Sequence, residues 1–223
     1  MDKTLFFSAI TKFVLGLVCT ALLLFVPAGT VHFPGGQLLM FLLFVPMFIA
    51  GLVLLAVNPA LLRSRLQARE TQPEQKAMVA LSALMFLFGF IAAGLDFRFG
   101  WSAMPSPLPS CAAVLFLLAY ALYAEVLREN TWLSRTVRVQ DGQQLVDTGL
   151  YNLIRHPMYA ATILLFLSMP LVLGSWVSFE IFLCYPVLIA VRIKNEEQVL
   201  ETQLTGYADY KVRVKYRLIP YIW

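Results

Sequence analysis

The stretch Gly149-Leu-Tyr-Asn-Leu-Ile-Arg-His-Pro-Met-Tyr159 decides how this chain is organised, because it places polar side chains between two long apolar regions. It holds two tyrosines, an arginine and a histidine, whereas most of the chain is Leu, Phe, Val and Ala. A second polar cluster, Arg192-Ile-Lys-Asn-Glu-Glu197, follows after one further apolar stretch. We expect the two clusters to meet at a membrane surface and to bind a small cationic molecule there.

The composition predicts an integral membrane protein. Of 223 residues, 60% are hydrophobic and 13% are charged, and a soluble domain of this size cannot bury so much apolar surface. No polar linker is long enough to separate two domains, so one domain is expected. The three cysteines, Cys19, Cys111 and Cys184, lie in apolar runs without metal-ligand spacing. We therefore expect no metal site, and no nucleic-acid partner at a net charge of only +4.

Four apolar segments have the length of about 20 residues that a membrane-spanning helix needs. They run roughly over Phe7–Val26, Leu38–Val57, Ala77–Leu95 and Ser110–Leu127. The first segment is too long for a usual signal peptide and is not followed by a cleavage pattern, so we interpret it as a retained span.

The segment Tyr159–Val191 is also apolar, but Pro170 and Gly174-Ser-Trp176 interrupt it. Each half has only about 16 residues, which is short for a span. We interpret the pair as a helical hairpin that enters and leaves on the same side. The predicted fold is therefore all-α and polytopic, with four transmembrane helices in residues 1–127. The hairpin, a polar loop and a basic tail form a C-terminal region, residues 128–223, within one integrated domain.

The connections carry the charge. Leu61–Lys76 is expected to be a polar loop, and Val137–Val146 alternates weakly around Asp141-Gly142, which predicts a small hairpin or an extended loop. Under this topology every Lys and Arg except Arg98 lies on one side of the membrane. The excess of positive charge predicts that this side, with both termini and both polar clusters, is cytoplasmic.

If the hairpin is correct, Arg155–Tyr159 and Arg192–Glu197 lie at its two feet and are neighbours in space. Together they would offer a carboxylate, aromatic rings, an imidazole and a guanidinium to one ligand. Each residue also has a plainer interpretation. The arginines could be positive anchors at the boundary and the tyrosines part of an aromatic belt, while Arg192 and Glu196 could form a surface ion pair worth about 0.5 kcal/mol.

The joint pattern is more specific than its parts. Gly149-Leu-Tyr-x-x-x-Arg-His-Pro-x-Tyr159, then Arg-x-x-x-Glu-Glu197 and Gly206-Tyr-x-x-Tyr210, resembles the isoprenylcysteine carboxyl methyltransferase family, which is related to the membrane phospholipid N-methyltransferases. The resemblance covers about residues 125–220. It implies an integral membrane enzyme whose cofactor, S-adenosylmethionine (SAM), lies in a pocket built by the C-terminal helices and their cytosolic loops.

The resemblance also implies a set of site residues. The cofactor would be bound by Gln143, Gln144, Leu145, Val146, Tyr151, His156, Pro157, Met158, Tyr159, Glu196 and Glu197. Arg192 would face the acid group of the substrate, and His156 is a second catalytic candidate. These residue types suit the cofactor, because a sulfonium cation is attracted by a carboxylate and by aromatic faces.

The predicted reaction is carboxyl O-methylation of a lipid-like, isoprenylcysteine-type substrate that reaches the enzyme through the lipid bilayer. A carboxylate is already ionised at neutral pH and needs no general base. N-methylation of a lipid amine is the alternative, and it would require His156 or Glu197 as a base. Two other classes stay open: a sterol-type reductase that binds a nicotinamide cofactor, and a non-catalytic scaffold or transporter.

Overall fold

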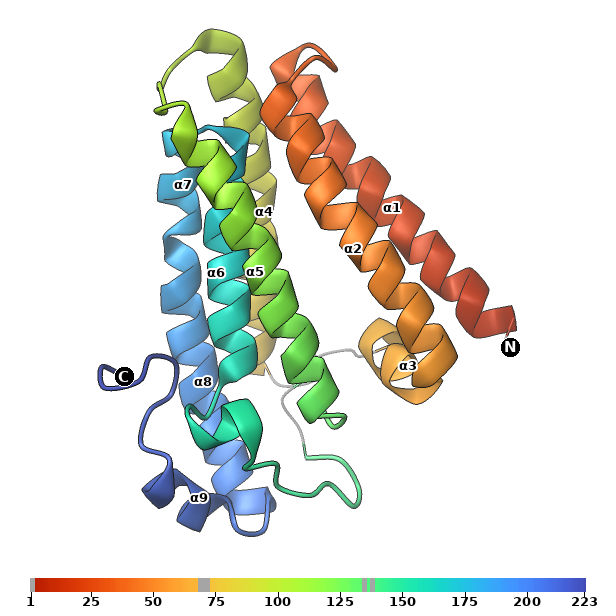
Figure 1. Ribbon diagram of the computed structural model, residues 1–223, viewed down its shortest axis with the longest axis vertical. Helices are drawn as coiled ribbons and strands as arrows, with labels where there is room; N and C mark the ends of the chain where they lie inside the picture. Colours follow the sequence, from red (N-terminus) through yellow and green to blue (C-terminus); the bar gives the residue numbers. More distant parts are fainter. Residues whose placement is uncertain (1–2, 68–72, 134–135, 137–138) are drawn as a thin grey trace.

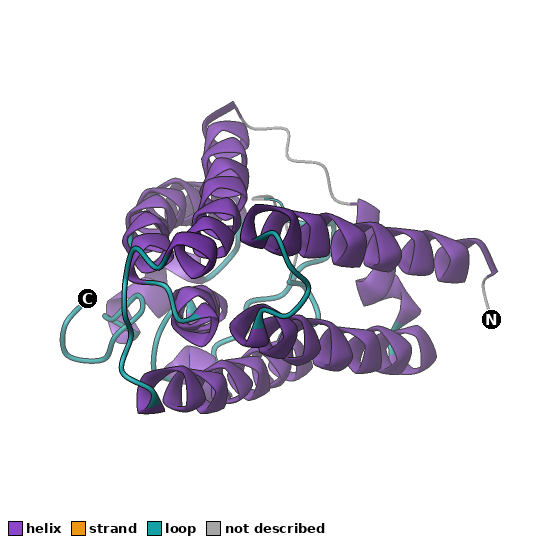
Figure 2. Cartoon of the chain, turned by 90° about the horizontal axis from the view of Figure 1, so that it is seen from above, coloured by secondary structure: helices purple, strands orange, loops and turns teal. Residues whose placement is uncertain are grey.

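The computed structural model describes residues 3–67, 73–133, 136 and 139–223. Within this part of the chain there are helices and loops and no strand, which confirms the all-α prediction (Figure 2). The α-helices are α1 Lys3–Ala28, α2 Pro34–Val57, α3 Pro59–Gln67, α4 Pro73–Phe99, α5 Pro107–Glu129, α6 Pro157–Leu173, α7 Trp176–Phe182, α8 Cys184–Gln203 and α9 Tyr207–Arg213. A 3₁₀ helix, η1, spans Gly149–Asn152.

Five stretches of helix are long and apolar enough to cross a membrane. Four of them, in α1, α2, α4 and α5, are the four spans expected from the sequence, each extended by a few residues. Their outward faces carry many exposed Leu, Val and Phe side chains, such as Phe41 and Leu118. Lipid is the solvent that suits such faces, as expected for a multi-pass membrane protein.

The predicted hairpin is present, but its arms differ in length. α6 has 17 residues, and it ends at Gly174, whose φ of +75° suits a glycine at a helix C-terminus. Ser175 then caps α7 by accepting a hydrogen bond from Ser178 N. The second arm, Trp176–Gln203, has 28 residues, so the prediction of about 16 is wrong for this arm. The helix continues because its polar end is rich in Glu, Gln, Leu and Lys, which are good helix formers.

The polar connection after the second span is not entirely a loop. Residues 59–67 form α3, which corrects the prediction of a loop over Leu61–Lys76. Pro59 occupies the first helical position, where its missing N–H has no consequence, and the Asn58 side chain accepts a hydrogen bond from Leu61 N at 3.0 Å. The Asn58-Pro59 pair that ends α2 therefore also starts α3.

Asp141-Gly142 forms the predicted turn. Gln143 N donates to Gln140 O at 3.0 Å, and Gly142 has a φ of +71°. The flanking residues 139–146 form loop rather than paired strands, so a β-hairpin is absent from the described part of this segment. Val137 and Arg138 lie outside the described residues.

The helices alternate in direction, so the two feet of the hairpin lie at one end of the molecule together with α3, η1 and α9 (Figure 1). α7 and the connection between α4 and α5 lie at the opposite end. There, the buried carboxylate of Asp96 accepts hydrogen bonds from Ser102 N at 2.7 Å and from the hydroxyl groups of Ser102 and Ser175. These hydrogen bonds hold the tip of the hairpin, at Ser175, against the end of α4.

The core lies between the hairpin and the spans α4 and α5. Phe86 of α4 packs edge-on against Phe166 of α6 and Phe182 of α7, with ring centroids 4.8 and 5.3 Å away. α1 and α2 lean away from this bundle and join it near the end that carries α7 (Figures 1 and 2). There Gly94 lies so close to Leu24 O that a Cβ atom would approach it to 2.5 Å.

Candidate functional site

The Arg155-His156 pair at the centre of the decisive stretch is held by the C-terminal segment that follows α9. Arg155 N donates to Tyr216 O and His156 N donates to Arg217 O, both at 2.9 Å. Pro157 then starts α6. These two main-chain hydrogen bonds fix the backbone at the start of α6, and the contact of the His156 ring with the Glu197 carboxylate at 3.2 Å orients the ring.

Glu197 is the centre of a buried ionic cluster. It is 3% exposed, and its carboxylate accepts from Arg155 Nε at 2.7 Å and from Arg217 Nε at 3.0 Å, while the His156 ring lies 3.2 Å away. The Arg155 guanidinium also donates to Val214 O at 2.6 Å. A buried carboxylate is tolerated when it is paired in this way. The cluster ties the foot of α6 to the foot of α8.

Gly149 allows a close contact that positions η1. Its φ is +53°, and a Cβ atom at this position would lie 1.8 Å from Glu129 Oε1. The Glu129 carboxylate accepts a hydrogen bond from Leu150 N at 2.9 Å, at the start of η1. From the other side, Tyr210 Oη donates to Tyr151 O at 2.7 Å. Tyr210 of the Gly206-Tyr-x-x-Tyr210 motif therefore supports the main chain of η1 at Tyr151.

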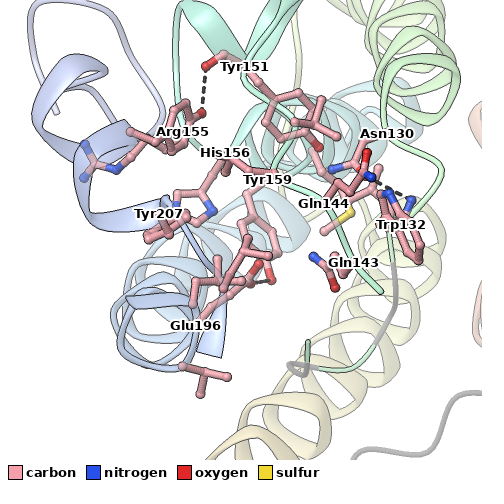
Figure 3. Close-up of a pocket in the computed structure, with 18 of the residues that line it drawn as sticks. Asn130, Trp132, Gln143, Gln144, Tyr151, Arg155, His156, Tyr159, Glu196 and Tyr207 are labelled. Atoms are coloured by element: carbon pink, nitrogen blue, oxygen red, sulfur yellow. Dashed lines mark hydrogen bonds between the residues drawn. The ribbon is translucent and has the colours of Figure 1, made fainter. Parts of the chain in front are cut away.

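These supports enclose a cavity at the feet of the hairpin (Figure 3). Side chains reach it from the segment after α5, η1, the start of α6, the end of α8 and α9. The residues that line it are Asn130, Trp132, Leu133, Thr136, Gln143, Gln144, Leu145, Val146, Tyr151, Arg155, His156, Met158, Tyr159, Glu196, Val199, Leu200, Leu204, Tyr207 and Tyr210. The wall therefore combines amides, phenols, an imidazole and a carboxylate with apolar side chains.

Tyr159 connects the two arms of the hairpin at the cavity wall. Its hydroxyl group donates a hydrogen bond to the Glu196 carboxylate and accepts one from Arg192 Nε at 2.9 Å. The interpretation of Arg192 and Glu196 as a mere surface pair does not describe this arrangement, because the phenol of α6 joins them. His156 and Tyr159 also face each other, with ring centroids 5.8 Å apart.

Burial raises the pKa of Tyr151, Tyr207 and Tyr210. For Tyr207 the nearby carboxylates of Glu197 and Glu196 raise the pKa further. These hydroxyl groups therefore stay protonated and can donate hydrogen bonds. Within the described part of the chain, the buried Tyr207 Oη has no hydrogen-bond partner, although it belongs to a residue of the cavity wall. An unpaired buried hydroxyl group costs free energy, and a polar ligand would satisfy it.

The structure brings together most of the residues that the sequence analysis proposed for a cofactor. Those on the cavity wall are Gln143, Gln144, Leu145, Val146, Tyr151, His156, Met158, Tyr159 and Glu196. Pro157 is buried at the start of α6, and Glu197 lies in the ionic cluster; neither lines the cavity. Arg192 lines a neighbouring groove instead.

Several wall residues were not proposed from the sequence. Asn130 and Trp132 come from the segment directly after α5, Val199 and Leu200 come from the end of α8, and Leu204 directly follows α8. Tyr207 stood in the quoted Gly206-Tyr-x-x-Tyr210 motif, which was the available signal for it. After the fourth span the sequence signal was Trp132, an aromatic residue near a membrane boundary. Such residues are common in membrane proteins of every function, so Trp132 did not indicate a cofactor site.

The neighbouring groove has a volume of about 370 Å³ and lies between α3, α4, α5, α6 and α8. Most of its wall is apolar, with Phe86, Phe166 and Leu188 among its residues. Met158 and Tyr159 line both the groove and the polar cavity. Ligands bound in the two spaces would thus both contact these two side chains.

Residues 109–205 match the family model of the phospholipid methyltransferases. Two similar proteins align over 91 residues, or 40% of this chain: the delta(14)-sterol reductase TM7SF2 of Mus musculus at 30% identity, and the uncharacterized protein YpbQ of Bacillus subtilis (strain 168) at 31%. The alignments span 22% and 54% of those proteins.

The fold matches that of the eukaryotic intramembrane Ras methyltransferase ICMT (isoprenylcysteine carboxyl methyltransferase). The TM-score is 0.59 at 19% sequence identity, and the match covers 96% of this chain and 77% of that protein. The matching family model agrees with the resemblance drawn from the sequence motifs over residues 109–205, and the solved methyltransferase shares the fold of the chain.

Proposed function

We propose that this chain, which carries a phospholipid-methyltransferase-type region within the ICMT fold, is a membrane methyltransferase that takes SAM as the methyl donor. One observation supports this most strongly: a polar cavity and an apolar groove share a wall made of Met158 and Tyr159. Group transfer requires the reacting atoms to lie about 3 to 3.5 Å apart, so a polar donor and a lipid-like acceptor must bind in adjoining spaces whose reactive ends meet beside these two side chains.

The chemistry of the cavity suits SAM, which would supply a methyl group bonded to a sulfonium centre. The Glu196 carboxylate and the faces of Tyr151 and Tyr159 are suitable partners for that positive charge. The amides of Gln143 and Gln144 and the unpaired Tyr207 Oη offer hydrogen bonds to polar groups of the donor. We propose these residues, with His156 and the apolar wall around them, as the donor site.

The groove suits the acceptor. We propose that its apolar wall receives the hydrocarbon part of an amphiphile from the bilayer and that Arg192 binds the acid group, since a guanidinium binds a carboxylate through two hydrogen bonds. Carboxyl O-methylation of an isoprenylcysteine-type substrate is the favoured reaction, because an ionised carboxylate needs no general base. The protein then has to align the reactants and exclude water.

The site end of the molecule would face the cytoplasm. α3, α9, the feet of the hairpin and the segment that follows α9 lie at this end, and together they carry most of the described Lys and Arg residues (Figure 1). Positive residues are enriched on the cytoplasmic side of membrane proteins. A water-soluble donor would enter from that side, and the acceptor would enter from the membrane.

The sterol reductase similarity makes a nicotinamide cofactor the second candidate. The cavity does not favour it. NADPH carries a 2′-phosphate besides its pyrophosphate, and an arginine near the site accommodates that phosphate in dinucleotide-binding folds. Among the described wall residues Arg155 is the one Lys or Arg, and its guanidinium already binds Glu197 and Val214 O.

Titration of the purified protein in detergent with SAM and with NADPH separates the two candidates. We expect saturable binding of SAM and none of NADPH; the reverse result would contradict the proposal. The reaction is then tested with methyl-labelled SAM and membrane lipid extract. An ester product loses its label in mild alkali, whereas an N-methyl product retains it, so the same assay distinguishes O-methylation from N-methylation.

A further inference from the structure

The acceptor groove is lined by two arginines that come from different helices. Arg192 comes from α8, and Arg65 comes from α3. Phe166 lies nine residues after Pro157, so at helical rise it is about 13 Å further into the bundle than the start of α6. The groove therefore has a cationic end near the donor cavity and an apolar end toward the bilayer interior.

Arg65 is held in a defined position. Its guanidinium stacks over the Tyr123 ring, with Cζ 5.5 Å from the ring centroid, and it donates a hydrogen bond to Tyr123 Oη. Arg65 is part-buried, and α3 is anchored by the Asn58 cap and by a hydrogen bond from Lys12 to Leu66 O. Because α3 is capped and anchored, the Arg65 guanidinium is held in one position at the groove.

The charge of the groove indicates what it binds. Its described wall contains two arginines and no Asp or Glu, and the remainder is apolar apart from a few hydroxyl groups. An oxyanionic headgroup in the groove would be attracted by both guanidinium groups. A neutral amphiphile would gain only from the apolar wall.

We propose that Arg65, supported by Tyr123, is a specificity-determining contact for the acceptor. It binds the oxyanionic headgroup from the α3 side while Arg192 binds it from α8, and so it selects anionic amphiphiles over neutral ones. This inference rests on the proposed function of the groove. Arg65 lies outside residues 109–205, the region that matches the family model, so this contact belongs to the N-terminal half of the chain.

The test compares a fluorescent fatty acid, cis-parinaric acid, with its methyl ester, using the full-length protein in detergent. The two ligands share the hydrocarbon chain and differ in headgroup charge. Hydrogen bonds between charged groups are stronger than neutral ones, so Arg65→Gln should weaken binding of the acid roughly tenfold or more. Binding of the ester and of SAM should not change.

Two further variants make the result specific. Arg63→Gln removes an exposed arginine from the same helix at a position outside the groove, and it should leave acid binding unchanged. Arg65→Lys keeps the charge and should recover part of the affinity. Equal weakening of acid and ester in Arg65→Gln, or no change in either, would overturn the proposal, as would loss of SAM binding in that variant, which would assign Arg65 a structural role. A wild-type protein that binds the acid over the ester but not SAM would instead refute the methyltransferase function.

Discussion

The hydroxyl group of Tyr159, in the first turn of α6, donates a hydrogen bond to the carboxylate of Glu196, near the end of α8. The two residues are 37 positions apart in sequence. Their contact closes the hairpin at its feet and places one phenol between the polar cavity and the apolar groove. The donor and acceptor sites that we propose therefore meet at Tyr159 and at its neighbour Met158.

Arg192 donates to the same phenol and lines only the groove. Arg192→Ala should therefore weaken acceptor binding by roughly tenfold or more while changing SAM affinity little. The measurement is the apparent KM for the acceptor beside the Kd for SAM. Equal losses of both would show that Arg192 supports the whole site through Tyr159 and does not bind the acceptor's acid group.

Glu197 should be required for the fold more than for direct donor contact. Glu197→Ala leaves Arg155 and Arg217 without their buried carboxylate, and breaking a buried ion pair costs about 3 to 5 kcal/mol. We expect a clear fall in the unfolding temperature of the detergent-solubilised protein. Glu201→Ala is the control, because Glu201 lies on α8 like Glu197 but forms a surface ion pair, with Lys211 of α9. An unchanged unfolding temperature with weakened SAM binding would instead make Glu197 a direct ligand.

Gly149 and Gly142 form a matched pair for testing the η1 support. Both have positive φ, so alanine at either position carries about 1 to 2 kcal/mol of backbone strain. A Cβ atom on Gly142 meets nothing within 4 Å, whereas one on Gly149 would collide with the Glu129 carboxylate. Gly149→Ala should therefore lower stability and SAM affinity more than Gly142→Ala does. Equal effects of the two substitutions on both quantities would contradict the role assigned to Glu129.

The tyrosines around the cavity predict a loss of stability at alkaline pH. Burial raises the pKa of Tyr151, Tyr207 and Tyr210, so the folded protein retains these protons where the unfolded chain releases them. Below about pH 10 the hydroxyl groups are neutral in both states and make no pH-dependent contribution. Above it the unfolded chain is favoured by ionisation, and stability falls as the pH rises.

Ultraviolet absorbance of tyrosinate and the helical circular dichroism signal, followed together, check this. Ionisation of the buried tyrosines should coincide with unfolding, and Tyr207→Phe should shift the unfolding midpoint to higher pH. Complete ionisation of all tyrosines while the helical signal is unchanged would contradict the buried positions of these three side chains.

The apolar composition, together with the polar, Pro and Gly residues that interrupt the apolar runs, was sufficient to predict the four N-terminal spans and the hairpin. Apolar runs of span length have few alternatives, and Gly174-Ser175 interrupts the last run at the hairpin tip. The second arm was predicted too short because its polar end resembled a loop. α3 was missed because the charged segment Leu61–Lys76 was interpreted as a polar loop, although Asn58-Pro59 before it provides a cap and a first-turn proline.

Within the site, sequence could identify the residue types but not their directions. Glu196 and Glu197 are adjacent, yet successive residues of a helix point about 100° apart. One glutamate consequently faces Tyr159 at the cavity, and the other faces Arg155 in the ionic cluster. Asn130 and Tyr207 reach the cavity from segments far apart in the chain, and only the folded structure shows that they share a wall.

The central claim is that the cavity at the feet of the hairpin binds SAM through Glu196, and calorimetric titration of SAM into three proteins tests it most directly. These are the wild type, Glu196→Gln, and Glu201→Gln as the matched substitution on the same helix outside the cavity. Removing the charge should weaken SAM binding by about tenfold or more in Glu196→Gln, with wild-type affinity in Glu201→Gln. Wild-type SAM affinity in a folded Glu196→Gln protein would contradict the account.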